Sequence, residues 1–139
     1  MKRILAYIAL SLLLALCIPA RAGAQKITDS SYRILGYIEP DGRIKDSSYR
    51  IIGYIQKDGK VQDSSYRTVA YIKSNGTFQD SSYRTIGYLS NDGKVQDSSY
   101  RTIGYIKDNG TIQDGQYRII GYANGTRKSW AAMYFFFLR

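Results

Sequence analysis

The sequence predicts an all-β protein built from tandem 17-residue β-hairpin repeats that close into a ring. The period is marked by six aspartates, which are Asp29, Asp46, Asp63, Asp80, Asp97 and Asp114. Each unit holds runs rich in Tyr, Ile and Thr that are bounded by Gly, Asn, Asp and Ser, a pattern typical of strand, turn and strand. No segment shows a helical periodicity long enough to compete with this assignment.

Residues 1–24 predict a secretory signal peptide, which takes no part in the fold. A basic start, "MKR", precedes the apolar run of residues 4–16, and the small residues "AGA" stand directly before Gln25. This order of basic, apolar and small residues indicates cleavage before Gln25.

The alternative to plain secretion is a lipid anchor at Cys17. Leu16 stands directly before that cysteine, where lipoprotein signals have a small residue. We therefore expect an exported protein, periplasmic or extracellular, whose residues 25–139 form a single domain.

Charge and composition exclude several kinds of chemistry. The predicted signal carries Lys2, Arg3 and Arg21 and no acid, so its removal lowers the net charge from +9 to +6. The chain contains no histidine, and its only cysteine lies in the signal, so the mature chain has no thiol or disulfide chemistry. The positive balance is compatible with polyanions or an anionic surface, and equally with a soluble protein whose charges sit in turns.

The turn at "EPDG" sets the register of the predicted hairpins. Pro40 suits the second position of a type I turn, Asp41 the third, and Gly42 a left-handed conformation after it. This predicts a three-residue loop with a glycine bulge. If "QKDG", "KSNG", "SNDG" and "KDNG" follow it, Ile55 lies opposite Val61.

Alternation along the strands assigns the two faces of each unit. In the second unit the predicted core face carries Tyr49, Ile51, Gly53, Ile55 and Val61. The opposite face carries Arg50, Ile52, Tyr54, Lys60 and Gln62. The small residue of the core face recurs as Gly36, Gly53, Ala70, Gly87, Gly104 and Gly121. Glycine inside a strand indicates close backbone approach or a bend.

The "DSS" segments should link one hairpin to the next, with Asp accepting backbone N–H bonds.

The sixth unit departs from the others, as terminal repeats do when they cap an array. Residues 123–139 lose two loop residues, and Asn124-Gly125 predicts a two-residue hairpin. Residues 130–138 predict a closing strand that seals the ring against "QKIT" at residues 25–28. Closure would remove the exposed strand edges.

This pattern resembles the β-flower proteins, specifically the five-fold kind. The resemblance rests on the tandem "DSSYRTIGYIK" units and on the closing segment "GYANGTRKSWAAMYFFFL", and covers essentially the whole mature chain. It implies small exported or membrane-anchored bacterial proteins whose hairpins radiate from a shallow symmetric barrel. It carries over no activity and no catalytic residue, because a fold alone does not define function.

The residues themselves predict no enzyme, metal or cofactor site. Hydrolytic triads need a base that is usually histidine. The Asp residues occupy equivalent positions, whereas an acid and a base need different surroundings. They are also too far apart in sequence for a metal-ligand cluster, and turn capping explains them.

The candidate ligand-binding residues are the repeated Arg and Tyr side chains, predicted to form a ring on one face. The arginines are Arg33, Arg50, Arg67, Arg84, Arg101 and Arg118. The tyrosines are Tyr37, Tyr54, Tyr71, Tyr88, Tyr105 and Tyr122. Arg beside aromatic rings can bind an anionic glycan or a lipid head group. In the competing interpretation each Arg pairs with a linker Asp and packs on Tyr.

The sequence therefore predicts an exported, non-enzymatic β-repeat protein of the bacterial cell envelope, structural or binding, with a receptor for an anionic ligand as the alternative. Export argues against nucleic acid as a partner. Runs of about seven residues are shorter than the ~9–11 of a membrane-spanning strand, so no transmembrane span is expected in the mature chain. The sequence does not name a partner.

Overall fold

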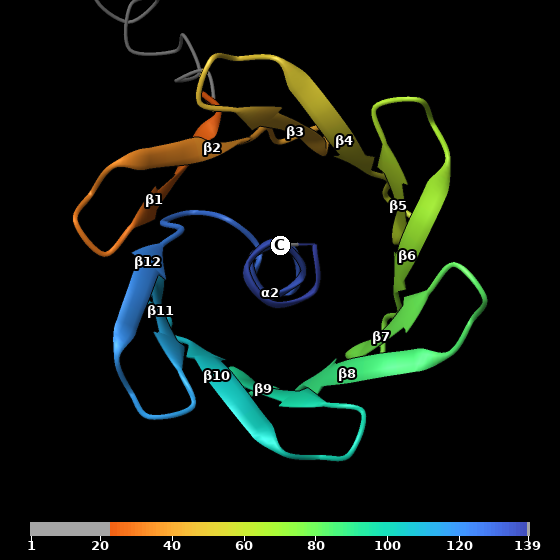
Figure 1. The fold of residues 1–139 in the computed structure, drawn as a ribbon, viewed down its shortest axis with the longest axis vertical. Coiled ribbons are helices and arrows are strands. Elements are labelled where there is room, and N and C mark those ends of the chain that lie inside the picture. The colour runs from red at the N-terminus through yellow and green to blue at the C-terminus, as the bar shows by residue number, and fades with distance from the viewer. Residues whose placement is uncertain (1–22, 139) are drawn as a thin grey trace, which may run out of the picture.

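The computed structural model describes residues 23–138, which form a closed antiparallel ring of strands around a short helical segment (Figure 1). The strands are β1 (Gln25–Asp29), β2 (Ile34–Ile38), β3 (Arg43–Asp46), β4 (Ile51–Ile55), β5 (Lys60–Asp63), β6 (Thr68–Ile72), β7 (Thr77–Asp80), β8 (Thr85–Leu89), β9 (Lys94–Asp97), β10 (Thr102–Ile106), β11 (Thr111–Asp114) and β12 (Ile119–Tyr122). Each strand pairs with its neighbours in sequence, and β12 pairs with β1. The predicted all-β ring of hairpins is confirmed.

The predicted signal peptide and Cys17 lie outside the described residues, except for Gly23 and Ala24. Within residues 23–138, no helix is long and apolar enough to cross a membrane.

Five glycine turns join the strand pairs β2–β3, β4–β5, β6–β7, β8–β9 and β10–β11. In the first, the Gly42 amide donates to the Glu39 carbonyl at 2.9 Å, and Gly42 has a φ of 95°. A side chain there would collide with the carbonyl of Ile55 at the end of β4, so the position requires glycine. The predicted loop is confirmed, and Ile55 lies opposite Val61.

Six tip loops of the form Asp-X-X-Tyr-Arg join the remaining strand pairs, from β1–β2 to β11–β12. We call each such pair a petal. In the first, the Tyr32 amide donates to the Asp29 carbonyl at 3.1 Å and the Asp29 amide to the Arg33 carbonyl at 2.9 Å, the same pattern as in a glycine turn. The "DSS" segments are therefore hairpin loops in their own right and not links between hairpins, and they project outward around the ring (Figure 1).

The tip loops place tyrosine in the left-handed region, with φ between 64° and 67° at all six positions. A residue with a Cβ adopts this conformation only reluctantly. The tips can hold tyrosine because these side chains point into open space, with 56–69% of their surface exposed.

The interior of the ring is lined by one residue from each short strand and by the ends of the long strands. The short-strand residues are Ile27, Ile44, Val61, Phe78, Val95 and Ile112, all with at most 2% of their surface exposed. In the second unit Gly53, Ile55 and Val61 are buried as predicted.

Two residues of the predicted core face, Tyr49 and Ile51, are instead exposed. Tyr49 belongs to a tip loop. Between β3 and β4 the register shifts, so that Gly53 pairs with Ile44 but Ile51 pairs with Lys45. The extra residue is Ile52, which lines an apolar pocket together with Gly53 and Ala70 although the alternation placed it on the opposite face.

The C-terminal segment is helical, and the prediction of a closing strand at Trp130–Leu138 is wrong. It forms α2 (Lys128–Ala132) and the π-helix η1 (Met133–Phe137), which with Leu138 we call the plug. Figure 1 shows it in the middle of the ring. The ring is closed instead by β12 on β1, with Thr28 opposite Tyr122.

The predicted two-residue hairpin at Asn124-Gly125 is likewise wrong. The Thr126 amide donates to the Ala123 carbonyl at 3.3 Å, and Gly125 has a φ of 76°. This turn leads the chain from β12 into α2, so no strand returns beside β12.

Successive aromatic residues of the plug pack against successive petals where the strand residue is small. The facing pairs are Tyr134 with Gly36, Phe135 with Gly121, Phe136 with Gly104 and Phe137 with Gly87. A side chain at any of the last three glycines would collide with the phenyl ring. The prediction of close approach at the small residue is confirmed, and the approaching group is the plug.

Candidate functional site

Each tip loop is held by the side chain of its aspartate. In the first, Asp29 Oδ1 accepts hydrogen bonds from the amides of Ser31 at 2.8 Å and Arg33 at 3.0 Å. The other five loops repeat both bonds, with Gln116 in the place of serine in the sixth. The predicted role of Asp as an acceptor for backbone N–H groups is therefore confirmed.

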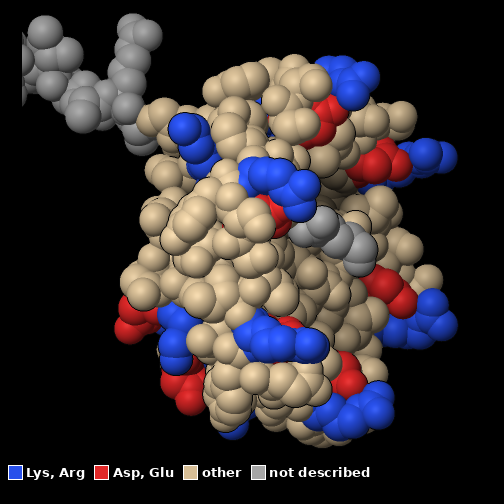
Figure 2. All heavy atoms as spheres, turned by 60° about the vertical axis from the view of Figure 1, so that its left-hand side comes forward, with Lys and Arg blue, Asp and Glu red and all other residues tan. Residues whose placement is uncertain are grey.

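The same aspartates hold the six predicted arginines. In every tip the Arg Nε lies 2.8–3.0 Å from the second carboxylate oxygen of Asp. In Figure 2 basic and acidic side chains lie next to each other in pairs along one edge of the molecule. The Arg side chains are nevertheless 76–82% exposed. Because only Nε contacts the carboxylate, the terminal amino groups remain open to solvent in five tips, while Arg118 also donates to Gln116.

The six predicted tyrosines form stacks with tip tyrosines, which the prediction did not include among the ligand-binding residues. The stacked pairs are Tyr32–Tyr122, Tyr37–Tyr49, Tyr54–Tyr66, Tyr71–Tyr83, Tyr88–Tyr100 and Tyr105–Tyr117, with ring centroids 4.4–4.9 Å apart. In each pair a strand tyrosine contacts the tip tyrosine of the next petal. The stacks therefore join neighbouring petals around the whole ring.

Among residues 23–138 the cation–π contacts are those of Lys45 with Tyr49 and of Arg127 with Trp130. The predicted tip arginines thus pair with Asp, and none of them is in a cation–π contact among these described residues. The constant spacing of the tyrosines could have indicated this pairing. Each tip tyrosine of an "SSY" or "GQY" segment follows its strand partner by 12 residues, except in the pair that closes the ring.

Hydrogen bonding shifts the pKa of both kinds of group. The backbone amide of the following Arg lowers the pKa of Asp29, Asp46, Asp63 and Asp97 more than any other cause. In Asp80 and Asp114 partial desolvation, which raises the pKa, is the largest single influence, but the hydrogen bonds and Arg together outweigh it. The hydrogen bond with the tip tyrosine raises the pKa of the strand tyrosines, except at Tyr37, where desolvation is the main cause.

The lowered pKa values predict that the ring loses stability in acid. The unfolded carboxylates titrate near pH 4, so the tip aspartates stabilise the fold fully above that pH. Their contribution is lost as the pH falls below 4 through the folded pKa. We expect Asp97→Asn to lower the melting temperature at neutral pH and to flatten its decrease between pH 5 and pH 2.5. The matched control is Asp58→Asn, a turn carboxylate without an arginine partner; an equal effect of both changes would contradict this assignment.

The plug leaves part of the ring unfilled. It covers four of the six small positions, and the other two, Gly53 and Ala70, border an apolar pocket of about 760 Å³. Ile52, Val69 and Leu138 line the same pocket. Ala70 stands where the other units have glycine, and it is buried at the edge of this pocket.

Residues 23–138 contain no group of three or more His, Cys, Asp or Glu residues that could hold a metal ion. The six tip aspartates have the same kinds of hydrogen-bond partner, and the pKa of each is lowered.

The geometry defines a closed ring of petals that is held together at the tips and partly filled by a C-terminal plug. The model of the 5-fold beta-flower protein family matches residues 24–139, and the chain belongs to that family. Its described part has five hairpins with glycine turns, and β12 and β1 together supply the sixth pair of strands. No curated protein and no solved structure was found to match the sequence.

Proposed function

We propose that this protein is an exported, non-enzymatic structural module of the bacterial cell envelope. The observation that carries this proposal is that all six tips use their charged and aromatic groups in internal contacts. Asp pairs with Arg within a tip, and tyrosine stacks on tyrosine between petals. The family match begins at residue 24, next to the predicted first mature residue Gln25, which supports removal of a signal peptide.

A second candidate is a receptor for an anionic ligand, a polysaccharide or a lipid head group, that binds at the tips. The terminal amino groups of the tip arginines favour it, because Asp occupies only Nε. The adjacent carboxylate opposes it, because it neutralises each tip locally. The Asp–Arg pairs are therefore better suited to stabilising the tip loops than to binding anions.

The test compares the protein secreted by a Gram-negative host with its Arg84→Gln, Arg101→Gln double variant. The secreted chain should have the mass of residues 25–139. Thermal unfolding is measured alone, with polygalacturonate, and with phosphatidylglycerol vesicles, at low and physiological salt. A structural module predicts that the double variant melts at a lower temperature and responds to each probe as the wild type does. A salt-sensitive rise that the double variant loses would assign the tips as the site and overturn the structural proposal.

A further inference from the structure

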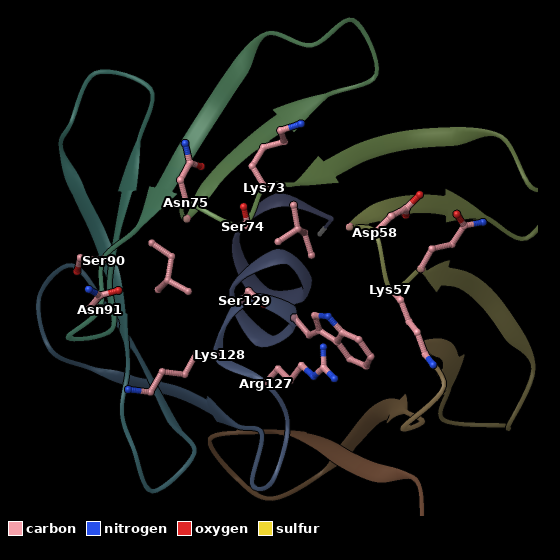
Figure 3. A pocket seen from close by; sticks show the side chains of 16 residues that line it. Lys57, Asp58, Lys73, Ser74, Asn75, Ser90, Asn91, Arg127, Lys128 and Ser129 are labelled. Atoms are coloured by element: carbon pink, nitrogen blue, oxygen red, sulfur yellow. The ribbon is translucent and has the colours of Figure 1, made fainter.

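A second cavity, polar and basic, opens where the glycine turns surround the start of the plug. Its volume is about 660 Å³, within the ~300–1,000 Å³ of pockets that hold small ligands. Three turns line it, at residues 56–59, 73–76 and 90–91, together with residues 127–130. Figure 3 shows Arg127 and Ser129 near its middle, and Lys57, Lys73 and Lys128 extending outward on three sides.

This mouth of the ring is unlike the tips, because its residues break the repeat. The tips keep "DSSYR" in five of six copies, whereas the turns read "EPDG", "QKDG", "KSNG", "SNDG" and "KDNG". Arg127 and Trp130 have no counterpart in the other units, since Arg127 directly precedes α2 and Trp130 lies within it. Within their turns, Asp58 Oδ1 accepts a hydrogen bond from the Lys60 amide at 3.0 Å and Asn75 Oδ1 accepts one from the Thr77 amide at 3.1 Å. Lys57 and Lys73 stand at turn positions whose residue changes from repeat to repeat.

The charges of this cavity are available to a ligand. Within the described residues 23–138, Lys57, Lys73 and Arg127 form no ion pair, whereas every tip arginine does. The guanidinium of Arg127 lies 4.9 Å from the centre of the Trp130 ring, which holds it in place. One carboxylate, that of Asp58, lies among these cations.

Neutral hydrogen-bonding groups complete the cavity. Asn75 and Asn91 supply amide groups, and Ser74 and Ser129 supply hydroxyl groups. Cations suit carboxylate, sulfate or phosphate groups, while amides, hydroxyls and the single carboxylate suit sugar hydroxyls. We propose that this cavity binds a short anionic oligosaccharide. The proposal goes beyond the structural role above, because it assigns a ligand to a place that does not involve the tips.

The test is isothermal titration of the full mature chain with a trimer of galacturonic acid. We expect saturable binding of one trimer per chain that weakens with salt, and no binding of the neutral trisaccharide maltotriose. The Lys57→Gln, Lys73→Gln double variant should lower the affinity at least about tenfold, since charged hydrogen bonds are lost. Both changes lie in exposed turn positions and leave the turn glycines in place.

The matched control is Lys107→Gln, which alters the residue equivalent to Lys73 in a turn that does not line the cavity. It should bind as the wild type does, and so should the Arg84→Gln, Arg101→Gln variant, which separates this site from the tips. The proposal is overturned if the trimer does not bind, if Lys107→Gln weakens it as much as the double variant does, or if inorganic phosphate competes at equal concentration. In the last case the cavity would be a simple anion site.

Discussion

Truncation of the chain after Thr126 is expected to abolish cooperative unfolding. The plug contributes four large side chains with at most 9% of their surface exposed, Trp130, Met133, Tyr134 and Phe135. Burial of each stabilises the fold by about 1.5–3 kcal/mol, so together they contribute about 6–12 kcal/mol, comparable with the ~5–15 kcal/mol net stability of a typical domain. Without them the inner faces of the strands would also be open to water. Circular dichroism during heating and urea titration measures the transition.

Leu138→Ala is the matched control for this truncation, because Leu138 is part of the plug but is 36% exposed. It should change the free energy of unfolding by less than about 1 kcal/mol. If the truncated chain unfolds cooperatively at the temperature of the intact one, the ring is stable without the plug and its central role is refuted.

Gly104→Ala is expected to destabilise the protein by about 1–3 kcal/mol, the usual cost of overpacking. A methyl group there would collide with the Phe136 ring and lie 2.5 Å from the carbonyl oxygen of Gln113. Neither group can move away easily, because the ring belongs to the plug and the carbonyl to the adjacent strand. The free energy of unfolding in urea measures the effect.

Gly53→Ala provides the comparison at the equivalent position of another petal. Its methyl group would meet the Gln62 carbonyl oxygen at 2.8 Å but no plug ring, and Ala70 already occupies the corresponding place one petal further on. We expect less than half the effect of Gly104→Ala. Equal losses would mean that strand packing alone, and not the plug, requires the glycines.

The sequence predicted the parts of the fold that depend on local chemistry. Gly42 sits where a left-handed residue must follow a type I turn, so the loop and the pairing of Ile55 with Val61 could be derived from turn rules. The tip loop has the same hydrogen bonds but carries Tyr32 in place of glycine. Turn rules do not predict this loop, because a tyrosine with positive φ depends on open space and on a stacking partner that the neighbouring petal supplies.

The plug could not be predicted from pattern, because its conformation depends on the hollow that surrounds it. The run "MYFFFL" is apolar on every side and has neither strand nor helix periodicity. Inside the ring each aromatic residue has its own glycine to pack against, and the π-helical turn, with the Leu138 amide donating to the Met133 carbonyl at 2.9 Å, presents them in succession. The face of Ile52 was assigned wrongly for a similar reason. A β-bulge moves a side chain to the other face of the strand, and the residue composition of the strand gives no sign of it.

At the tips, the sequence named the six arginines that pair with Asp and one tyrosine of each stacked pair, while their role in binding a ligand stays a prediction. Repetition predicted that all six Arg would have the same environment, and they do. The mouth cavity was not predicted, because Lys57, Lys73 and Arg127 are distant in sequence and meet only where the turns surround the plug.

The most direct test of the plugged ring is a measurement of nuclear Overhauser effects in a protein labelled with ¹³C at phenylalanine and glycine. The structure predicts cross-peaks between the Phe136 ring and the Gly104 α-protons, and between the rings of Phe78 and Phe137, whose centroids lie 4.8 Å apart. Backbone cross-peaks of residues 130–138 with residues 25–28, in the pattern of paired strands, would contradict the account and show a closing strand in place of the plug.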